Sequence, residues 1–342
     1  MYFLDRMNWV KKKIGILFMV VLMVGCNGCW DKNELKNLAL ISGMGVDRTS
    51  DGKYITTFQV IIPSMVKEGG SGSKGPGGGG GSGGGMTQAV LVTSGESMTG
   101  FGSARVNRFW ISRNLYLPTS QVIVFGQDAA RQGIRSAYDL YARYPQKRLT
   151  EMVVVAKGTA SEILKAQNQI DKIPAIALIT LMNDSYNWTG QVIATRSIDL
   201  FEYRVSKTRA AVMPQVEVIT APVGEKVIKM SGTAVIRKDR LVGELNENET
   251  RGLLWVLGKV KLALLEIGDK SGKGMASLEV TQARSLNADI YGFGEAVKRK
   301  HPREWKTMKS KWDKIFPQIK LAIKVETTVF SSGELLKPPL PQ

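Results

Sequence analysis

Two cysteines near the amino terminus, Cys26 and Cys29, are the residues whose position points most directly to chemistry. They follow a basic run, Lys11 to Lys13, and an apolar stretch from Ile14 to Gly25. A positive segment, an apolar segment and a small residue before a cysteine are typical of an export signal. The apolar stretch is shorter than the roughly 20 residues that a membrane-spanning helix needs. We therefore predict that residues 1–25 are a lipoprotein signal peptide and that a cysteine after it accepts a diacylglycerol lipid.

The residues before each cysteine favour Cys26 as the lipidated one. Gly25 lies directly before Cys26, and three apolar residues precede that glycine. Cys29 instead follows Gly28 and the polar Asn27, with Cys26 itself three residues earlier. Cys29 stays the alternative acceptor. An uncleaved or ordinary signal with two structural thiols is the remaining interpretation.

The rest of the chain offers little for familiar catalysis. His301 is the only histidine, and it lies in a basic run. A metal site built from histidine and cysteine is therefore excluded, and a Ser-His-Asp triad would depend on this one residue. Asp and Glu are plentiful, so a carboxylate-pair hydrolase is the enzymatic alternative that stays open. We expect no enzymatic activity, no metal and no cofactor apart from the covalent lipid.

The formal net charge of +17 is informative about partners. Loss of residues 1–25 would remove four basic residues and one acidic residue, which leaves about +14. A basic exported protein is suited to an anionic membrane surface or to an acidic protein or polymer. Export argues against nucleic acid as a partner.

Local signals after the anchor predict a helix followed by a hairpin. Asp31 with Glu34 three residues later is typical of a helix start, and we expect a helix through Leu40. Strands are predicted at Gly45 to Asp47 and at Tyr54 to Ile62, joined around Asp51-Gly52.

The glycine-rich run at 69–85 is predicted to be a flexible loop inside one domain, because the strand Ala89 to Thr93 then resumes the sheet. A phosphate-binding loop is the alternative, and it lacks the expected Lys-Ser or Lys-Thr pair after the glycines. Further along, apolar runs such as Met152 to Ala156 alternate with helical patterns such as Ala160 to Ala166. We therefore expect an N-terminal α/β region at residues 26–210.

Near residue 210 the alternation of predicted strands and helices gives way to consecutive predicted strands. Strands are predicted at Gln215 to Thr220, Val227 to Ile236 and Leu241 to Leu245, with Lys238-Asp239 as the turn between the last two. Asn246 and Glu249 form a capping pair for a helix through Trp255. Residues 211–342 are accordingly expected to form an α+β domain. The whole chain is predicted to be α+β and multi-domain, with mixed or antiparallel sheets flanked by helices.

The clearest local pattern lies near the carboxyl end. The residues of one apolar stripe recur at helical spacing: Trp305, Met308, Trp312, Ile315 and Phe316. The opposite face is lysine-rich, and the segment from Ile319 to Val329 alternates like an amphipathic strand. A membrane-surface helix is one interpretation. We favour a helix that packs its stripe into a core.

Three blocks of this sequence closely resemble the C-subunit lipoproteins of nutrient germinant receptors in spore-forming bacteria, the Ger(x)C family. The first runs from Gly28 through Trp30 to Leu35 and on from Leu40 to Asp47. The second runs from Gly232 to Asn246 and continues with Glu249, Arg251 and Trp255. The third comprises Asn287 to Glu295 with Trp305, Trp312 and Phe316. The candidate interaction or structural residues taken from these blocks are Trp30, Glu249, Arg251, Trp255, Trp305 and Trp312.

The resemblance implies a three-domain α/β fold and a lipid-anchored subunit on the outer face of the spore inner membrane. It implies two integral-membrane partners, the A and B subunits, and no catalytic residues. In the family the lipidated cysteine usually stands directly before Trp-Asp, which supports Cys29 before Trp30-Asp31. Relatives usually carry more sequence between the equivalents of Val280 and Asn287, so we expect the last domain to be abbreviated near residues 280–290. A solute-binding lipoprotein of a transporter is the rival function, and a cell-wall hydrolase is a second one.

Overall fold

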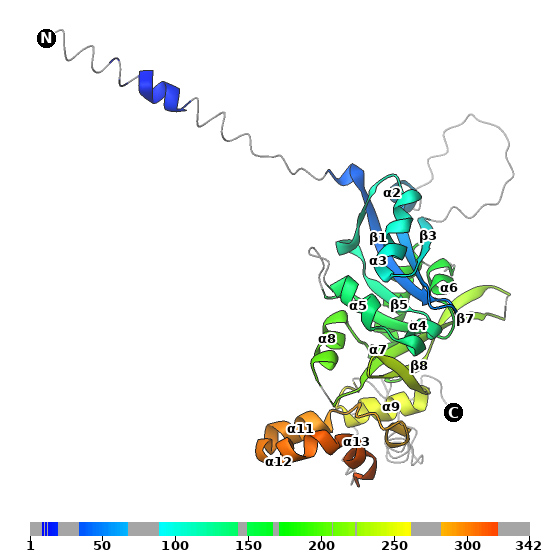
Figure 1. Ribbon diagram of the computed structural model, residues 1–342. Helices are drawn as coiled ribbons and strands as arrows, with labels where there is room; N and C mark the ends of the chain where they lie inside the picture. Colours follow the sequence, from blue (N-terminus) through cyan, green and yellow to red (C-terminus); the bar gives the residue numbers. More distant parts are fainter. Residues whose placement is uncertain are drawn as a thin grey trace, which may run out of the picture. The chain divides into compact units, whose positions relative to one another are not determined.

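The computed structural model of the chain describes residues 9, 11, 13–19, 34–67, 89–142, 149–166, 171–206, 208–222, 224–260 and 282–320. The chain divides into two compact units, Met1–Leu38 and Ala39–Gln342. In the first unit, residues 13–19 are helical and Leu35–Asn37 form a short 3-10 helix, η1. The second unit holds an α+β fold (Figure 1).

Strands and helices alternate through the first half of the second unit. The strands are β1 (Leu38–Arg48), β2 (Tyr54–Ile61), β3 (Val90–Ser97), β4 (Asn114–Tyr116), β5 (Val122–Phe125), β6 (Met152–Ala156), β7 (Ala211–Thr220), β8 (Lys226–Arg237) and β9 (Arg240–Leu245). The α-helices are α2 (Pro63–Lys67), α3 (Gly100–Val106), α4 (Gln127–Gln132), α5 (Arg135–Ala142), α6 (Ala160–Lys165), α7 (Pro174–Trp188), α8 (Ser197–Val205), α9 (Glu247–Val256), α11 (Phe293–Lys300), α12 (Pro302–Met308) and α13 (Trp312–Ile315). Further 3-10 helices are η2 (Asn107–Phe109), η3 (Leu117–Thr119), η4 (Lys309–Lys311) and η5 (Phe316–Gln318).

The nine strands of the described residues form one mixed sheet. Eight follow the order β3-β2-β1-β5-β6-β7-β8-β9, and β4 pairs with β1 outside this path. The central pairs β1–β5, β5–β6 and β6–β7 are parallel. The outer pairs β1–β2, β2–β3, β7–β8 and β8–β9 are antiparallel. Short connections join the strands of three of these pairs, as is usual for antiparallel neighbours, whereas residues 62–89 separate β2 from β3.

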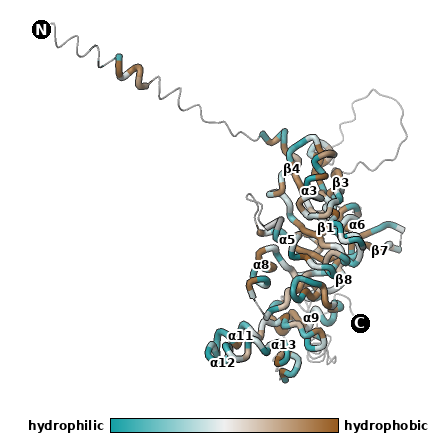
Figure 2. Tube along the Cα trace, in the orientation of Figure 1, coloured by the Kyte–Doolittle hydropathy of each residue, from teal (hydrophilic) through white to brown (hydrophobic). Residues whose placement is uncertain are grey.

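The central strands are buried on both faces. Ile123 and Phe125 of β5 belong to one hydrophobic cluster, whereas Val122 and Val124 belong to a second cluster. This alternation follows from the two-residue period of a strand, and it explains why β5 and β6 read as unbroken apolar runs. The first cluster includes side chains of α5, α8 and α9, and the second includes side chains of α6 and α7. Figure 2 shows the hydrophobic colouring concentrated along these strands.

Two hairpin predictions are confirmed. The chain turns between β1 and β2 at Gly52, whose φ of 84° lies in the left-handed region that glycine adopts without strain. Between β8 and β9 the two turn residues Lys238 and Asp239 have φ angles of 51° and 64°. Positive φ at both central residues is the signature of a two-residue hairpin turn whose twist matches the strands.

The helix predicted from Asp31 to Leu40 is wrong at its carboxyl end. Strand β1 begins at Leu38, and among the described residues of the predicted helix, which start at Glu34, Leu35–Asn37 form a single 3-10 turn. Ala39 and Ile41 are buried in the sheet core, whereas Leu35 is exposed. Burial of Ala39 and Ile41 in the core, together with the pairing of β1 with β4, β2 and β5, therefore overrides the local capping signal.

The sheet continues across the expected boundary at residues 210/211. Strand β7 begins at Ala211, and its residues Gln215 and Val216 pair with Val155 and Ala156 of β6. The division into separate domains stays a prediction. The glycine-rich segment 69–85 lies outside the described residues, as does almost all of the strand predicted from Ile319 to Val329.

Candidate interaction surface

Helix α9 begins with the capping pair that the sequence predicts. The Asn246 side chain accepts a hydrogen bond from the Glu249 amide at 2.9 Å, and Glu249 Oε2 accepts one from the Asn246 amide at 2.7 Å. Two backbone amides at the start of the helix are satisfied in this way. Glu249 therefore has a local structural task in addition to any contact with a partner.

Arg251 and Trp255 lie on the same helix and are half-buried. Their neighbours Leu253 and Leu254 are fully buried, and the Thr250 hydroxyl lies 2.9 Å from that of Thr233 on β8. These contacts fix α9 on the sheet. The Arg251 Nε atom is buried without a hydrogen-bond partner among the described residues.

The aromatic stripe near the carboxyl end is buried. Trp305 and Trp312 are 6% and 2% exposed, and their rings meet edge to face with centroids 5.2 Å apart. Phe316 lies next to Trp312 with centroids 6.4 Å apart. The stripe thus packs into the first hydrophobic cluster, as the core interpretation predicts. A 3-10 turn, η4, separates α12 from α13, so the segment is not one regular helix.

Asp289 organises this region, and the sequence patterns did not single it out. It is 2% exposed. Its Oδ1 accepts a hydrogen bond from the Phe293 amide at 2.9 Å, and its Oδ2 accepts from the Gly294 amide at 2.8 Å and from Trp312 Nε1 at 3.2 Å. One carboxylate therefore joins the start of α11 to α13. The sequence signals were its place in the third family-like block, Asn287 to Glu295, and its position three residues before Gly292-Phe293-Gly294.

Burial raises the pKa of Asp289 above its ordinary value of 3.8, because a charged carboxylate loses solvation inside the protein. Hydrogen bonds from the Gly294, Phe293 and Gly292 amides and from Trp312 act in the opposite direction and are outweighed. This carboxylate has a structural role, because it accepts hydrogen bonds from two backbone amides of α11 and from the Trp312 indole of α13.

Ionic contacts tie the same helices to the β8–β9 turn. Asp313 of α13 lies 2.9 Å from Arg237 and 3.2 Å from Lys238. The Asn287 side chain donates to the Asp313 carbonyl at 2.8 Å. The predicted residues Glu249, Arg251, Trp255, Trp305 and Trp312 are therefore distributed over one continuous packed region. They do not converge on a single catalytic centre.

Some predicted residues cannot be placed. Cys26, Cys29 and Trp30 lie outside the described residues. Within the described part of the chain, no helix is both long and apolar enough to cross a bilayer. No cluster of three or more His, Cys, Asp or Glu side chains in that part could hold a metal ion. His301 is exposed, with Glu304 as its acidic neighbour at 4.0 Å.

Comparison with known proteins gives a consistent result. A family described as spore germination protein N-terminal domain matches residues 31–218. A second family, described as spore germination B3/GerAC-like, C-terminal, matches residues 231–285 and 275–333.

Spore germination protein KC of Bacillus subtilis (strain 168) is 25% identical over 406 aligned residues, which cover 95% of this chain and 97% of that protein. Putative spore germination protein YfkR of the same organism is 25% identical over 273 residues, covering 78% and 66%. Among solved structures, the crystal structure of the GerBC protein covers 84% of this chain and 96% of its own, with a TM-score of 0.42 and 15% identity.

Proposed function

Because this chain belongs to the family of spore germination proteins, we propose that it is a non-enzymatic, lipid-anchored subunit of a nutrient germinant receptor. In this role it supports assembly and signalling of the receptor during spore germination. The observation that carries the proposal is the match of both family domains, in order, over residues 31–218 and 231–333.

The anchor is part of the proposal. The basic run, the apolar stretch and the Gly-Cys pair at Cys26 support covalent attachment of diacylglycerol, and the Trp30-Asp31 pair supports Cys29 as the alternative. Metabolic labelling with a palmitate analogue should mark the wild-type chain. Loss of label in Cys26→Ala or in Cys29→Ala identifies the acceptor, and label that persists in the double variant contradicts the anchor.

The proposed partners are the integral-membrane A and B subunits of the same receptor, at the outer face of the spore inner membrane. A tether raises the effective concentration of the chain near such partners, so modest contacts suffice. Arg251 and Trp255 are the candidate contact residues on α9, since both are only half-buried. Nucleic acid is not a proposed partner.

The rival function, a solute-binding lipoprotein, would be built from two similar lobes around a cleft. The described strands instead form one continuous sheet in which β6 and β7 pair directly. This arrangement favours the receptor-subunit proposal.

We also propose that the C-terminal domain is shortened near residues 280–290. Two observations support this. The C-terminal family matches two segments that share residues 275–285, and the alignment with spore germination protein KC spans 406 positions, more than the 342 residues of this chain.

Deletion of the chain tests the function. A spore without it should fail to respond to the nutrients of its own receptor and should still germinate with non-nutrient triggers that act downstream. A form without the anchor cysteines should complement poorly. Normal nutrient germination in the deletion, with no redundant receptor present, would contradict the proposal, as would full complementation by the unanchored form at normal abundance.

A further inference from the structure

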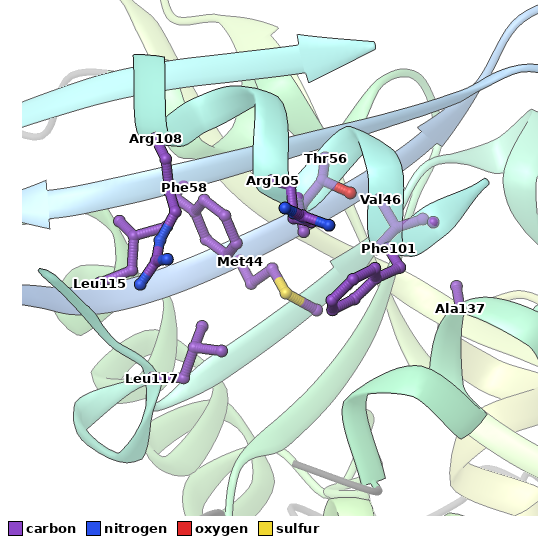
Figure 3. A pocket seen from close by; sticks show the side chains of 12 residues that line it. Met44, Val46, Thr56, Phe58, Phe101, Arg105, Arg108, Leu115, Leu117 and Ala137 are labelled. Atoms are coloured by element: carbon purple, nitrogen blue, oxygen red, sulfur yellow. The ribbon is translucent and has the colours of Figure 1, made fainter. Parts of the chain in front are cut away.

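A cavity on one face of the sheet is not used by the proposed function. It has a volume of about 350 Å³ and lies between strands β1 and β2, helix α3 and the segment from β4 to η3. Figure 3 shows the side chains that converge on it from these elements. Ligand pockets of proteins fall in the range of roughly 300–1,000 Å³, so the size is sufficient for a small molecule.

The wall of the cavity is apolar. Its lining consists mainly of aliphatic and aromatic side chains: Met44, Val46, Phe58, Phe101, Leu115 and Leu117. The hydroxyl of Thr56, a polar residue of the lining, is already hydrogen-bonded, because it lies 2.7 Å from the hydroxyl of Ser103. An apolar body is therefore the part of a ligand that this wall would accept.

Two arginines supply the only charge in the lining. Arg105 and Arg108 line the cavity from α3 and η2, and both are exposed. The Arg105 guanidinium lies 5.5 Å from the centre of the Phe101 ring. No carboxylate among the described residues lies within ion-pair distance of either arginine, and no acidic side chain belongs to the lining.

We propose that this cavity binds an amphiphilic anion: a molecule with an apolar body of about ten carbons and one carboxylate or phosphate head. The apolar body of the ligand packs against the lining residues Met44, Phe58 and Leu117. Its anionic head group contacts the exposed side chains of Arg105 and Arg108. The size follows from comparison with an apolar cavity of about 150 Å³, which binds benzene, since the present volume is roughly twice as large. A zwitterionic amino acid is a poor ligand, because its ammonium group would face two guanidinium groups and no acceptor carboxylate.

The experiment uses the full chain in neutral proteoliposomes and a decanoate probe with a photoreactive diazirine at the end of its chain. Adducts should map to peptides that carry Met44, Phe58 or Leu115. Excess decanoate should remove these adducts, decanol should compete less well, and decylamine should leave them unchanged. This comparison needs no mutation, so it tests the proposal even if a variant fails to fold. Equal competition by decylamine, or adducts confined to other peptides, overturns the proposal.

The arginine variants test the head group. Combined Arg105→Gln and Arg108→Gln should weaken decanoate binding about five- to tenfold, as expected for two exposed ion pairs, and added salt should weaken wild-type binding. Arg113→Gln is the matched control, because Arg113 is exposed nearby but does not line the cavity. Unchanged binding in the double variant overturns the proposal.

A second set of competitors in the same labelling experiment distinguishes a free carboxylic acid from an anionic lipid as the ligand. Competition by decanoate alone assigns a free carboxylic acid as the ligand. Competition by didecanoyl phosphatidylglycerol at lower concentration assigns an acyl chain of an anionic lipid. Competition by neither overturns the site.

Discussion

At the scale of single residues, Trp312 and Asp289 decide how the carboxyl-terminal helices are held. Trp312 contributes its ring to the hydrophobic cluster and its indole N–H to the Asp289 carboxylate. The carboxylate also accepts hydrogen bonds from two backbone amides at the start of α11. A buried polar group satisfied by the chain itself stabilises one arrangement of these helices.

Replacement of Trp312 by alanine should lower the free energy of unfolding by about 3–5 kcal/mol, because a large buried aromatic side chain is lost and a donor to Asp289 is removed. Chemical unfolding followed by circular dichroism measures the change. Lys314→Ala is the control, since Lys314 is exposed in the same helix. If Trp312→Ala kept wild-type stability and lost only its binding to anionic vesicles, the helix would be a membrane-surface element.

The pKa of Asp289 predicts a dependence of stability on pH. Because burial raises this pKa in the folded state, the folded chain keeps a proton that the unfolded chain loses just above pH 3.8. The folded state then binds more protons in this window, so its stability falls as the pH rises through the folded pKa. The unfolding free energy of the wild type minus that of Asp289→Asn should therefore decrease as the pH is raised above about 4. Urea unfolding at several pH values measures this difference, and an increase would show that the pKa is lowered instead.

At the scale of secondary-structure elements, the hairpin β8–β9 and helix α9 depend on specific backbone positions. Gly232 has a φ of 101°, and a Cβ atom added there would collide with the carbonyl oxygen of Leu245. The close approach of two backbones explains why only glycine fits this position.

Gly232→Ala should destabilise the chain by about 2 kcal/mol more than Gly224→Ala. Both glycines have positive φ, so both variants are strained, but a Cβ at Gly224 meets nothing within 4 Å. The pair of variants separates the steric clash from the cost of the backbone conformation. The melting temperatures of the two variants are compared with that of the wild type. Equal decreases would mean that the sheet accommodates a Cβ atom at Gly232 without further loss of stability.

Glu249→Ala should cost about 1 kcal/mol through loss of the capping pair with Asn246. Glu249→Gln should cost less, because the amide oxygen can still accept the hydrogen bond from the Asn246 amide. Asn248→Ala is the control at an exposed position of the same turn. A germination response that is lost in Glu249→Gln at normal abundance would show that the charge contacts a partner.

At the scale of the whole molecule, one sheet connects the two regions that the sequence pattern separates, residues 26–210 and 211–342. The parallel strands β1, β5, β6 and β7 form its centre, and antiparallel hairpins extend it on both sides. The ends of the segment that contains the glycine-rich run meet at this sheet, because the Ile62 amide donates to the Ala89 carbonyl at 2.8 Å and Ile61 pairs with Val90.

Deletion of residues 69–85, with a short Gly-Ser turn in their place, should change stability by no more than about 1 kcal/mol. The closure entropy of a loop changes by only about 0.6 kcal/mol for each doubling of its length, and the strand pairing on both sides is retained. Thermal unfolding of the deletion variant measures the effect. A large drop in melting temperature would indicate that the glycines pack against the domain or bind a ligand.

The sequence alone determined features that depend on neighbouring residues. The turns at Asp51-Gly52 and Lys238-Asp239, the cap at Asn246 and Glu249, and the aromatic stripe with Trp305 and Trp312 all agree with the structure. Each is set by local φ preferences, by a hydrogen bond between close residues or by the period of a helix, and these need no knowledge of distant contacts.

Only the tertiary structure decided the rest. Leu38 to Leu40 became strand as the first residues of β1, which pairs with β4 and, from Ile41 and Gly43 onward, with β2 and β5. The link from Asp289 to Trp312 spans 23 residues, and the Arg105–Arg108 cavity draws on segments from Met44 to Ala137. Such contacts depend on which faces meet once the sheet has formed. Sequence periodicity carries no information on that choice, because it fixes the side of an element on which a residue lies but not the partner across from it.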